Sequence, residues 1–378
     1  MNQTRKTLSS IWNHFQSNLF PALQDELGAL TEKQKKLVQA IDVAQVDRYF
    51  PYRGRLPGRP QSNRASIARA FIAKSIYNLP TTEMLLEHIK TSQSLRRICG
   101  WEKFNDIPDR STLSRAFTEF ANSELAQNIH ADVIQNLFGD QLVGHISRDS
   151  TAINAREKPE KTPKKKKEKK KRGRPKKGEE RPKKLKRIEK QSGDMTLKAM
   201  LDDLPNTCTV GTKRNSKGYK TSWTGYKLHI DSADGGIPIS CVLTSASLHD
   251  SQVAIPLAEM TAQRVTNCYD LMDAAYDSPL IKQHSESLGH VPLIDENPRN
   301  KKRKAEIKEE HKSSRVAGFK ASESLRYNER STVERVNGRL KDEFGGRSVR
   351  VKGAVKVMAH LMFGILTLTI DQLMRFAE

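Results

Sequence analysis

One short segment near the C-terminus places a carboxylate beside cationic groups and a phenol. Read as a helix, it carries Tyr327, Arg330, Glu334 and Lys341 at offsets 0, 3, 7 and 14, close to one face. A carboxylate can ligate a hard divalent cation, and Arg and Lys side chains can bind phosphate. A salt-bridged surface helix would carry the same residues, so the segment alone does not decide between the two interpretations. A metal site needs further carboxylates from elsewhere in the chain.

Two aspartates at the predicted ends of strands could supply these carboxylates. Asp149 ends the strand predicted at residues 142–149, and Asp273 ends the one predicted at 268–273. Taken alone, each is equally well explained as a cap for the next turn or as a ligand at the edge of a sheet. Together with Glu334 they form a set of three carboxylates that suits two divalent cations and phosphodiester cleavage.

Three other aspartates compete for the second position in this set. Asp231 precedes a predicted hairpin turn, and Asp250 is expected to be the N-cap before Ser251. Asp277 is expected to cap the helix that follows it. We therefore favour Asp273 as the second ligand.

The elements that would position these residues form two regions. Residues 1–138 show helical periodicity with arginines spread over several short helices, which suits a DNA-binding domain or a bundle with a solvated basic face. From residue 142 onward strands alternate with helices, which indicates a mixed sheet flanked by helices. The five predicted strands are at residues 142–149, 225–231, 237–243, 268–273 and 290–294.

Two further segments lie near the C-terminus, one of them polar and the other apolar. Residues 295–325 are polar and basic and are expected to be a linker. Residues 354–376 are strongly apolar and long enough for a membrane span. Because Lys356, His360 and Asp371 interrupt them, we expect a helix buried on the core instead.

The positive charge of the chain is concentrated in one segment. The net charge is +22, and residues 156–190 contribute +14 of it, from 20 Lys and Arg against 6 Asp and Glu. This excess favours polyanions such as DNA or RNA as partners. Residues 155–195 are expected to be disordered without DNA. Within them, the residues that resemble an AT-hook, which lies in the minor groove of A·T-rich DNA, are Arg172, Gly173, Arg174 and Pro175. A tether that only contacts phosphates fits this composition equally well.

The remaining composition excludes several classes of protein. The four cysteines, Cys99, Cys208, Cys241 and Cys268, are scattered without a C-x-x-C pair, so neither a zinc site nor a disulfide framework is indicated. The first residues lack the apolar core of a signal peptide. We expect a soluble protein of a reducing compartment.

The Y-x2-R-x3-E-x6-K pattern of residues 327–341 resembles, at all four positions, the signature of the DDE transposases of bacterial insertion sequences. Asp149 and Asp273, the latter in a D-x-x-Y-D-S context, match the first and second acidic residues of that family. The resemblance covers roughly residues 55–375. Further matching segments are residues 58–60, 108–115, 225–229 and 248–251.

The resemblance implies an α/β fold: an RNase H-like core with a mixed five-stranded sheet flanked by helices, preceded by an all-helical N-terminal domain. Residues 1–138 would be the DNA-binding domain, and residues 140–350 the catalytic domain, interrupted by the disordered basic insertion at 155–195. Residues 351–378 would be a C-terminal helix packed on the core. Asp273 and Glu334 are only 61 residues apart, so there is no room for the β-rich insertion that supports a hairpin intermediate in some relatives.

The chemistry implied by the resemblance is DNA transposition. Asp149, Asp273 and Glu334 would hold two Mg²⁺, for which Mn²⁺ could substitute. Water would cut at the transposon ends, and the freed 3′-OH would then attack target DNA. Tyr327 and the cations Arg330 and Lys341 would contact phosphates or order the DNA end.

The resemblance also implies the partners and the location of the protein. The partners would be double-stranded DNA, as transposon ends and as target, and a second copy of the chain in a homodimer, with no membrane. The location would be the bacterial cytoplasm, in association with the nucleoid. Two alternatives stay open: a transposase-derived DNA-binding protein that is no longer catalytic, and an RNase H-like nuclease without strand transfer.

Overall fold

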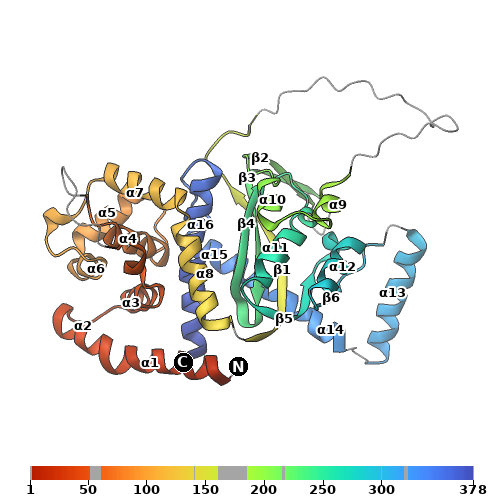
Figure 1. The fold of residues 1–378 in the computed structure, drawn as a ribbon, viewed down its shortest axis with the longest axis horizontal. Helices are drawn as coiled ribbons and strands as arrows, with labels where there is room; N and C mark the ends of the chain where they lie inside the picture. The colour runs from red at the N-terminus through yellow and green to blue at the C-terminus, as the bar shows by residue number, and fades with distance from the viewer. Residues whose placement is uncertain are drawn as a thin grey trace.

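The structure is a computed structural model that describes residues 2–51, 61–139, 141–160, 185–214, 218–298, 300–318 and 322–377 (Figure 1). A helical region lies on one side of a mixed sheet, and the long C-terminal helix runs between the two (Figure 1). Further helices cover the other face of the sheet.

The N-terminal region is helical, as its periodicity predicts. Its helices are α1 (Asn2–His14), α2 (Phe20–Leu27), α3 (Glu32–Ala44), α4 (Arg64–Ile76), α5 (Thr82–Thr91), α6 (Gln93–Cys99), α7 (Arg110–Asn122) and α8 (Leu125–Phe138). Side-chain oxygens of the preceding residue cap α3, α4, α5 and α6, which satisfies free amides of the first turn. Asp109 is the N-cap of α7, although its side chain makes no capping hydrogen bond.

The sheet has six strands, not the five expected from the sequence. They are β1 (Leu142–Asn154), β2 (Thr209–Arg214), β3 (Lys220–Ala233), β4 (Ile237–Ser245), β5 (Thr266–Met272) and β6 (Val291–Ile294). The strand order is β2-β3-β1-β5-β6, and β4 also pairs with β3. β1 is antiparallel to β3 and parallel to β5, so the sheet is mixed. Strand β2 escaped prediction because it is short and mostly exposed, and pairs with the polar first half of β3.

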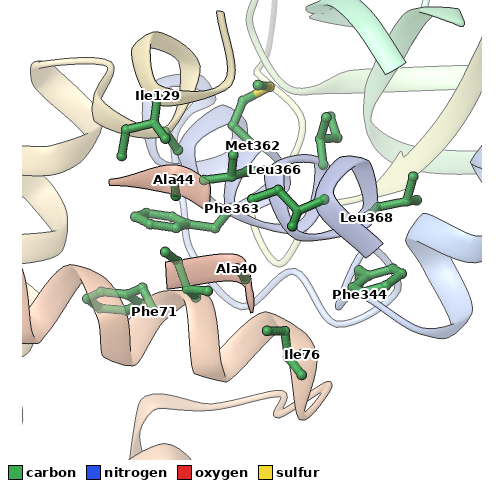
Figure 2. Packing of buried hydrophobic residues seen from close by; sticks show 14 of the residues in the cluster. Ala40, Ala44, Phe71, Ile76, Ile129, Phe344, Met362, Phe363, Leu366 and Leu368 are labelled. Carbon is green, nitrogen blue, oxygen red and sulfur yellow. The ribbon is translucent and has the colours of Figure 1, made fainter. Parts of the chain in front are cut away.

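Helix α16 (Ala354–Ala377) is the central element of the core. It packs on α1, α4, α7 and α8 on one side and on β4 on the other. Its length and composition would allow a membrane span, but 78% of its most apolar window is buried inside the protein, as expected for a core helix. Figure 2 shows Phe363 of α16 beside Phe71 of α4; their ring centroids are 5.7 Å apart. One apolar cluster therefore joins the helical region to the sheet.

The two faces of the sheet are covered by different helices. α15 (Ser331–Asp342) packs on β1 and β3, next to α16. On the other face, α11 (Ala254–Ala262) packs on β3 and β4, and α12 (Pro279–Ser287) packs beside it. This arrangement places consecutive residues of β1 in two different environments, because side chains alternate along a strand.

The expected disorder of residues 155–195 is wrong at both ends of that range. At its start, the backbone amide of Glu160 donates to the carbonyl of Cys208 at 2.9 Å. At its end, α9 (Arg187–Gln191) and α10 (Leu197–Asp202) are formed, and Gln191 is only 1% exposed. Arg187 holds α9 in place through Asp203, 2.6 Å away. These local contacts cannot be predicted from the composition of the segment, which is dominated by lysine. Residues 161–184 lie outside the described part of the chain.

The polar linker expected at residues 295–325 contains two helices, α13 (Lys301–Val316) and α14 (Ser322–Tyr327). α13 projects away from the body of the protein (Figure 1). It has no apolar stripe, so a search for hydrophobic periodicity cannot find it. On α13, Arg303 pairs with Glu306 and Glu310, three and seven residues further along the helix, at 3.5 and 3.0 Å.

Candidate active site

The register of two parallel strands brings Asp149 and Asp273 to the same place. The last pair of the β1–β5 ladder joins Arg148 to Met272, so the next residue on each strand is one of the two aspartates. Asp273 directly follows β5, as expected. Asp149 does not end its strand: β1 continues to Asn154, and Asp149 pairs with Ile230 of β3. Only the parallel pairing of β1 with β5 ends just before Asp149.

The side chain of Asp273 also caps a turn. Its Oδ1 accepts a hydrogen bond from the amide of Ala275 at 2.9 Å, at the start of a 3₁₀ turn (Ala274–Tyr276). The two explanations given for a strand-end aspartate are therefore compatible here, because a carboxylate has a second oxygen to offer a ligand.

Asp149 has the electrostatic surroundings of a site for positive charge. The pKa of Asp149 is raised from 3.8 to about 6. Burial is the largest cause, and the nearby carboxylates Asp273 and Asp250 add to it, against a lowering by the Ser150 amide and by Arg330. The pKa of Asp273 is also raised, first by burial and then by Asp250. Carboxylates that disfavour one another's charge are stabilised by a cation between them.

This pKa shift predicts a pH dependence of stability in the absence of divalent cations. A carboxyl group whose folded pKa is raised favours folding most when protonated, below about pH 4, and this contribution is lost as the pH rises through about 6. Asp149→Asn should therefore be more stable than wild type at pH 8, by up to about 3 kcal/mol, and the gain should vanish near pH 4. Thermal unfolding in EDTA at both pH values measures this. An equal gain at both would contradict the assignment of the shift to Asp149.

Glu334 lies on α15, which faces these aspartates. Asn337, one turn further along α15, donates to Asp149 Oδ2 at 3.2 Å. The Glu334 side chain is 55% exposed, and its carboxylate pairs with Arg330 at 3.0 Å. In the described part of the chain, no three or more His, Cys, Asp or Glu side chains are grouped closely enough to hold a metal ion. The structure thus brings Asp149 and Asp273 together and leaves Glu334 on the neighbouring helix.

The segment of residues 327–341 is not one uninterrupted α-helix. α14 ends at Tyr327, a 3₁₀ turn (Asn328–Arg330) follows, and α15 begins at Ser331. Arg330 still stacks over the ring of Tyr327, 5.8 Å from its centroid. Lys341 is half-buried, and burial lowers its pKa, followed by the cations Arg347 and Lys213. Of the predicted DNA-binding residues, Tyr327, Arg330 and Lys341 therefore lie on elements beside the aspartates. Arg172, Gly173, Arg174 and Pro175 lie outside the described residues.

The sequence interpretation set aside one group of this site, Asp250, and missed another, Lys213. Asp250 is not an N-cap, because His249 caps that 3₁₀ turn. It instead lies near Asp149 and Asp273, and Lys227 Nζ binds it at 2.8 Å. Lys213, near the end of the missed strand β2, acts on the pKa values of Asp273 and Lys341. The Lys227–Asp250 contact joins a strand to a turn 23 residues later, and no local pattern marks it.

The other two competing aspartates have structural partners. Asp231 is 0% exposed and accepts two hydrogen bonds from Arg148, at 2.8 and 2.6 Å. Asp277 accepts from the amide of Asn297 at 2.9 Å and pairs with Lys282 at 2.8 Å. Neither faces the site of Asp149 and Asp273 as a free carboxylate.

Two regions of the chain match known protein families. Residues 203–370 match the family described as transposase DDE domain, and residues 24–119 match the one described as transposase domain (DUF772). The first match includes Asp273 and Glu334 and begins after Asp149. The mixed sheet and its aspartates, with this match, define an RNase H-like domain of a DNA-acting enzyme. The chain belongs to the DDE transposases of insertion sequences. No curated protein and no solved structure matches the chain.

Proposed function

We propose that this transposase binds the ends of its insertion sequence, cuts them by metal-dependent phosphodiester hydrolysis, and joins the freed 3′-OH to target DNA. The observation that carries the proposal is the pairing of β1 with β5, which sets Asp149 next to Asp273 opposite α15 and Glu334. Asp149, Asp273 and Glu334 are the proposed catalytic residues. We also propose that the chain belongs to the branch with the Y-x2-R-x3-E-x6-K pattern, a proposal that the residues at 327–341 support.

DDE domains generally use divalent metal ions, and the donors here fit such ions. The aspartates offer carboxylate oxygens, which Mg²⁺ and Mn²⁺ prefer. The raised pKa of Asp149 indicates that its charged form lacks a compensating cation. We propose two Mg²⁺ ions held by Asp149, Asp273 and Glu334. Bound there, they would stabilise the charge that develops during cleavage and activate the attacking oxygen. Arg330 binds one oxygen of Glu334 at 3.0 Å, and we propose that it releases this oxygen when a metal ion binds.

Arg330 can make this exchange because its guanidinium has several donors. When it releases Glu334, it is free to bind a DNA phosphate in a two-pronged geometry. Tyr327 orients Arg330 by stacking, and Lys341 provides a second cation near Asp149. We propose that these three residues hold the DNA end beside Glu334.

Helix α13 provides a further surface for DNA. At 100° per residue, its exposed lysines Lys301, Lys304, Lys308 and Lys312 fall on one face, and the glutamates of the helix fall on the other. Among the described residues none of these lysines has an ion pair, whereas Arg303 on the acidic face has three. A uniformly basic face on a projecting helix suits the DNA backbone.

The remaining parts of the proposal concern assembly and location. We propose that residues 1–138 bind the element ends, that residues 140–350 form the catalytic domain with residues 351–378 packed on it, and that the protein acts as a homodimer on DNA. Its place would be the bacterial cytoplasm, at the nucleoid.

Cleavage of DNA that carries the element's ends tests this function. Wild type should cut it in Mg²⁺ and not in EDTA, and Glu334→Gln should lose cleavage while it still binds the same DNA. The readout is strand breakage on a denaturing gel, with binding measured by gel shift. Equal cleavage by wild type and Glu334→Gln would show that Glu334 is not a catalytic residue.

The same assay separates the alternatives. Specific binding without any cleavage by wild type would favour a DNA-binding protein that has lost catalysis. Cleavage without joining of the 3′-OH to a target plasmid would favour a nuclease.

A further inference from the structure

A second basic site lies where the helical region meets the elements that follow β1 and α15. It is a cavity of about 250 Å³ between α4, α5 and α7 on one side and Arg156 and Arg350 on the other. Lys74 of α4 and Arg110 of α7 complete its cationic lining. Phe71, Phe117 and Val351 form apolar parts of the wall. The cavity is distinct from the site of Asp149, which does not line it.

Lys74 is a buried cation without a counter-charge. Its side chain lies in the last turn of α4, and the residue is only 8% exposed. Among the described residues it has no ion pair or side-chain hydrogen bond, and burial alone lowers its pKa to about 8. Lys74 is one of the residues that line the cavity. Buried lysines are normally paired, so this one indicates an absent anion.

The charges around Lys74 do not supply that anion. The one carboxylate that lines the cavity, Glu83, is bound to Arg110. Arg156 and Arg350 are exposed and have no ion pair in the part of the chain that the structure describes. His360 stays neutral, because burial and the nearby charge of Lys74 lower its pKa to about 3, against a raising by its hydrogen bond to the carbonyl of Gly345. Four cations therefore face one neutralised carboxylate.

We propose that this cavity binds a phosphate group of the DNA strand that leads to the catalytic aspartates. Arginine and lysine side chains are common partners of phosphate groups, and four of them line this cavity. At about 250 Å³ the cavity is smaller than typical pockets for drug-sized ligands, roughly 300–1,000 Å³, and holds little more than a phosphate with its sugar. The identification of the strand as DNA rests on the proposed function.

The position of the cavity sets the position of the phosphate. Arg156 follows Asp149 by seven residues along and just beyond β1. At about 3.3 Å per residue, the backbone at Arg156 is at most roughly 23 Å from that at Asp149. DNA rises about 3.4 Å per base pair. The bound phosphate should therefore lie within roughly seven base pairs of the cut bond.

Inorganic phosphate tests the site without DNA or catalysis. In 50 mM phosphate, compared with chloride at equal ionic strength, we expect the Tm of the full chain to rise by about 2 °C. Lys74→Met should lose this rise, yet be at least as stable as wild type in chloride, because it removes an unpaired buried charge. Lys198→Met, which removes an exposed cation on α10, is the matched control and should keep the rise. An equal rise in Lys74→Met and wild type would overturn the proposal.

A second measurement, made with DNA, distinguishes a phosphate of the DNA strand from free inorganic phosphate as the ligand. Lys74→Met and Arg350→Gln should each lower the slope of log Kd against log salt by about 0.9, and Lys198→Met should not. A neutral methylphosphonate, scanned over the first ten base pairs of an element end, should weaken wild type at one position and leave Lys74→Met unaffected. Phosphate binding without any such position would reject DNA as the source. Because no step requires cleavage, a protein that binds here but never cuts would contradict only the proposed function.

Discussion

Asp149→Asn is expected to cut element-end DNA at least about 1,000-fold more slowly than wild type in Mg²⁺. Asp149 is the carboxylate that contacts α15 directly, through Asn337, and that has Asp273 and Asp250 as neighbours. Without its charge, the site loses an oxygen ligand for a divalent cation. A loss of several kcal/mol of transition-state stabilisation corresponds to about three orders of magnitude in rate. Single-turnover cleavage of a labelled duplex at pH 8 measures the loss.

The binding of DNA by Asp149→Asn should be unchanged or tighter, because the substitution removes a negative charge that faces a polyanion. Asp202→Asn, which alters an exposed carboxylate on α10, is the matched control and should cut as wild type does. Cleavage retained by Asp149→Asn would reject its role as a ligand. Weaker DNA binding by a variant whose Tm is not lowered would show that Asp149 organises the DNA surface instead.

The strands that carry the two aspartates could be predicted from the sequence, but their register could not. Alternation and apolar runs identify β1 and β5 one at a time. That Asp149 and Asp273 are neighbours depends on a parallel pairing between strands more than a hundred residues apart. The continuation of β1 beyond Asp149 did leave a signal. Thr151 and Ile153 are β-branched residues at alternate positions, which extends the strand pattern by two repeats.

The groups that the sequence interpretation missed or set aside share a different property. Asp250 and Lys213 reach the site from a short turn and from an exposed strand, neither of which has an apolar pattern. Helix α13 was taken for a linker for the same reason, since it has ion pairs such as Arg303 with Glu306 and no apolar stripe. Hydrophobic periodicity predicts the core of this protein. The polar elements around its site can be predicted only when the pairing of the strands in space is known.

Beneath the aspartates lies a buried charged pair that fixes their positions. Arg148 and Asp231 are directly opposite each other on β1 and β3, at 2% and 0% exposure. Thr261 of α11 gives Asp231 a further hydrogen bond at 2.7 Å, and Arg148 also donates to Met272 Sδ at 3.4 Å. Arg148 and Met272 are the residues that precede the two aspartates. Because strand side chains alternate, the pair faces α11 while Asp149 faces α15.

Arg148→Met is therefore expected to lower the free energy of unfolding by about 3–5 kcal/mol, because it leaves Asp231 in the core without its counter-charge. The double variant Arg148→Met/Asp231→Leu should recover most of this loss, since removal of both charges leaves an apolar contact. Urea unfolding followed by circular dichroism measures both. Arg97→Met, which removes a partner of the exposed carboxylates Glu26 and Glu102, is the control and should cost less than about 1 kcal/mol. If the double variant is no more stable than Arg148→Met, the loss comes from packing of the arginine stem and not from the stranded charge.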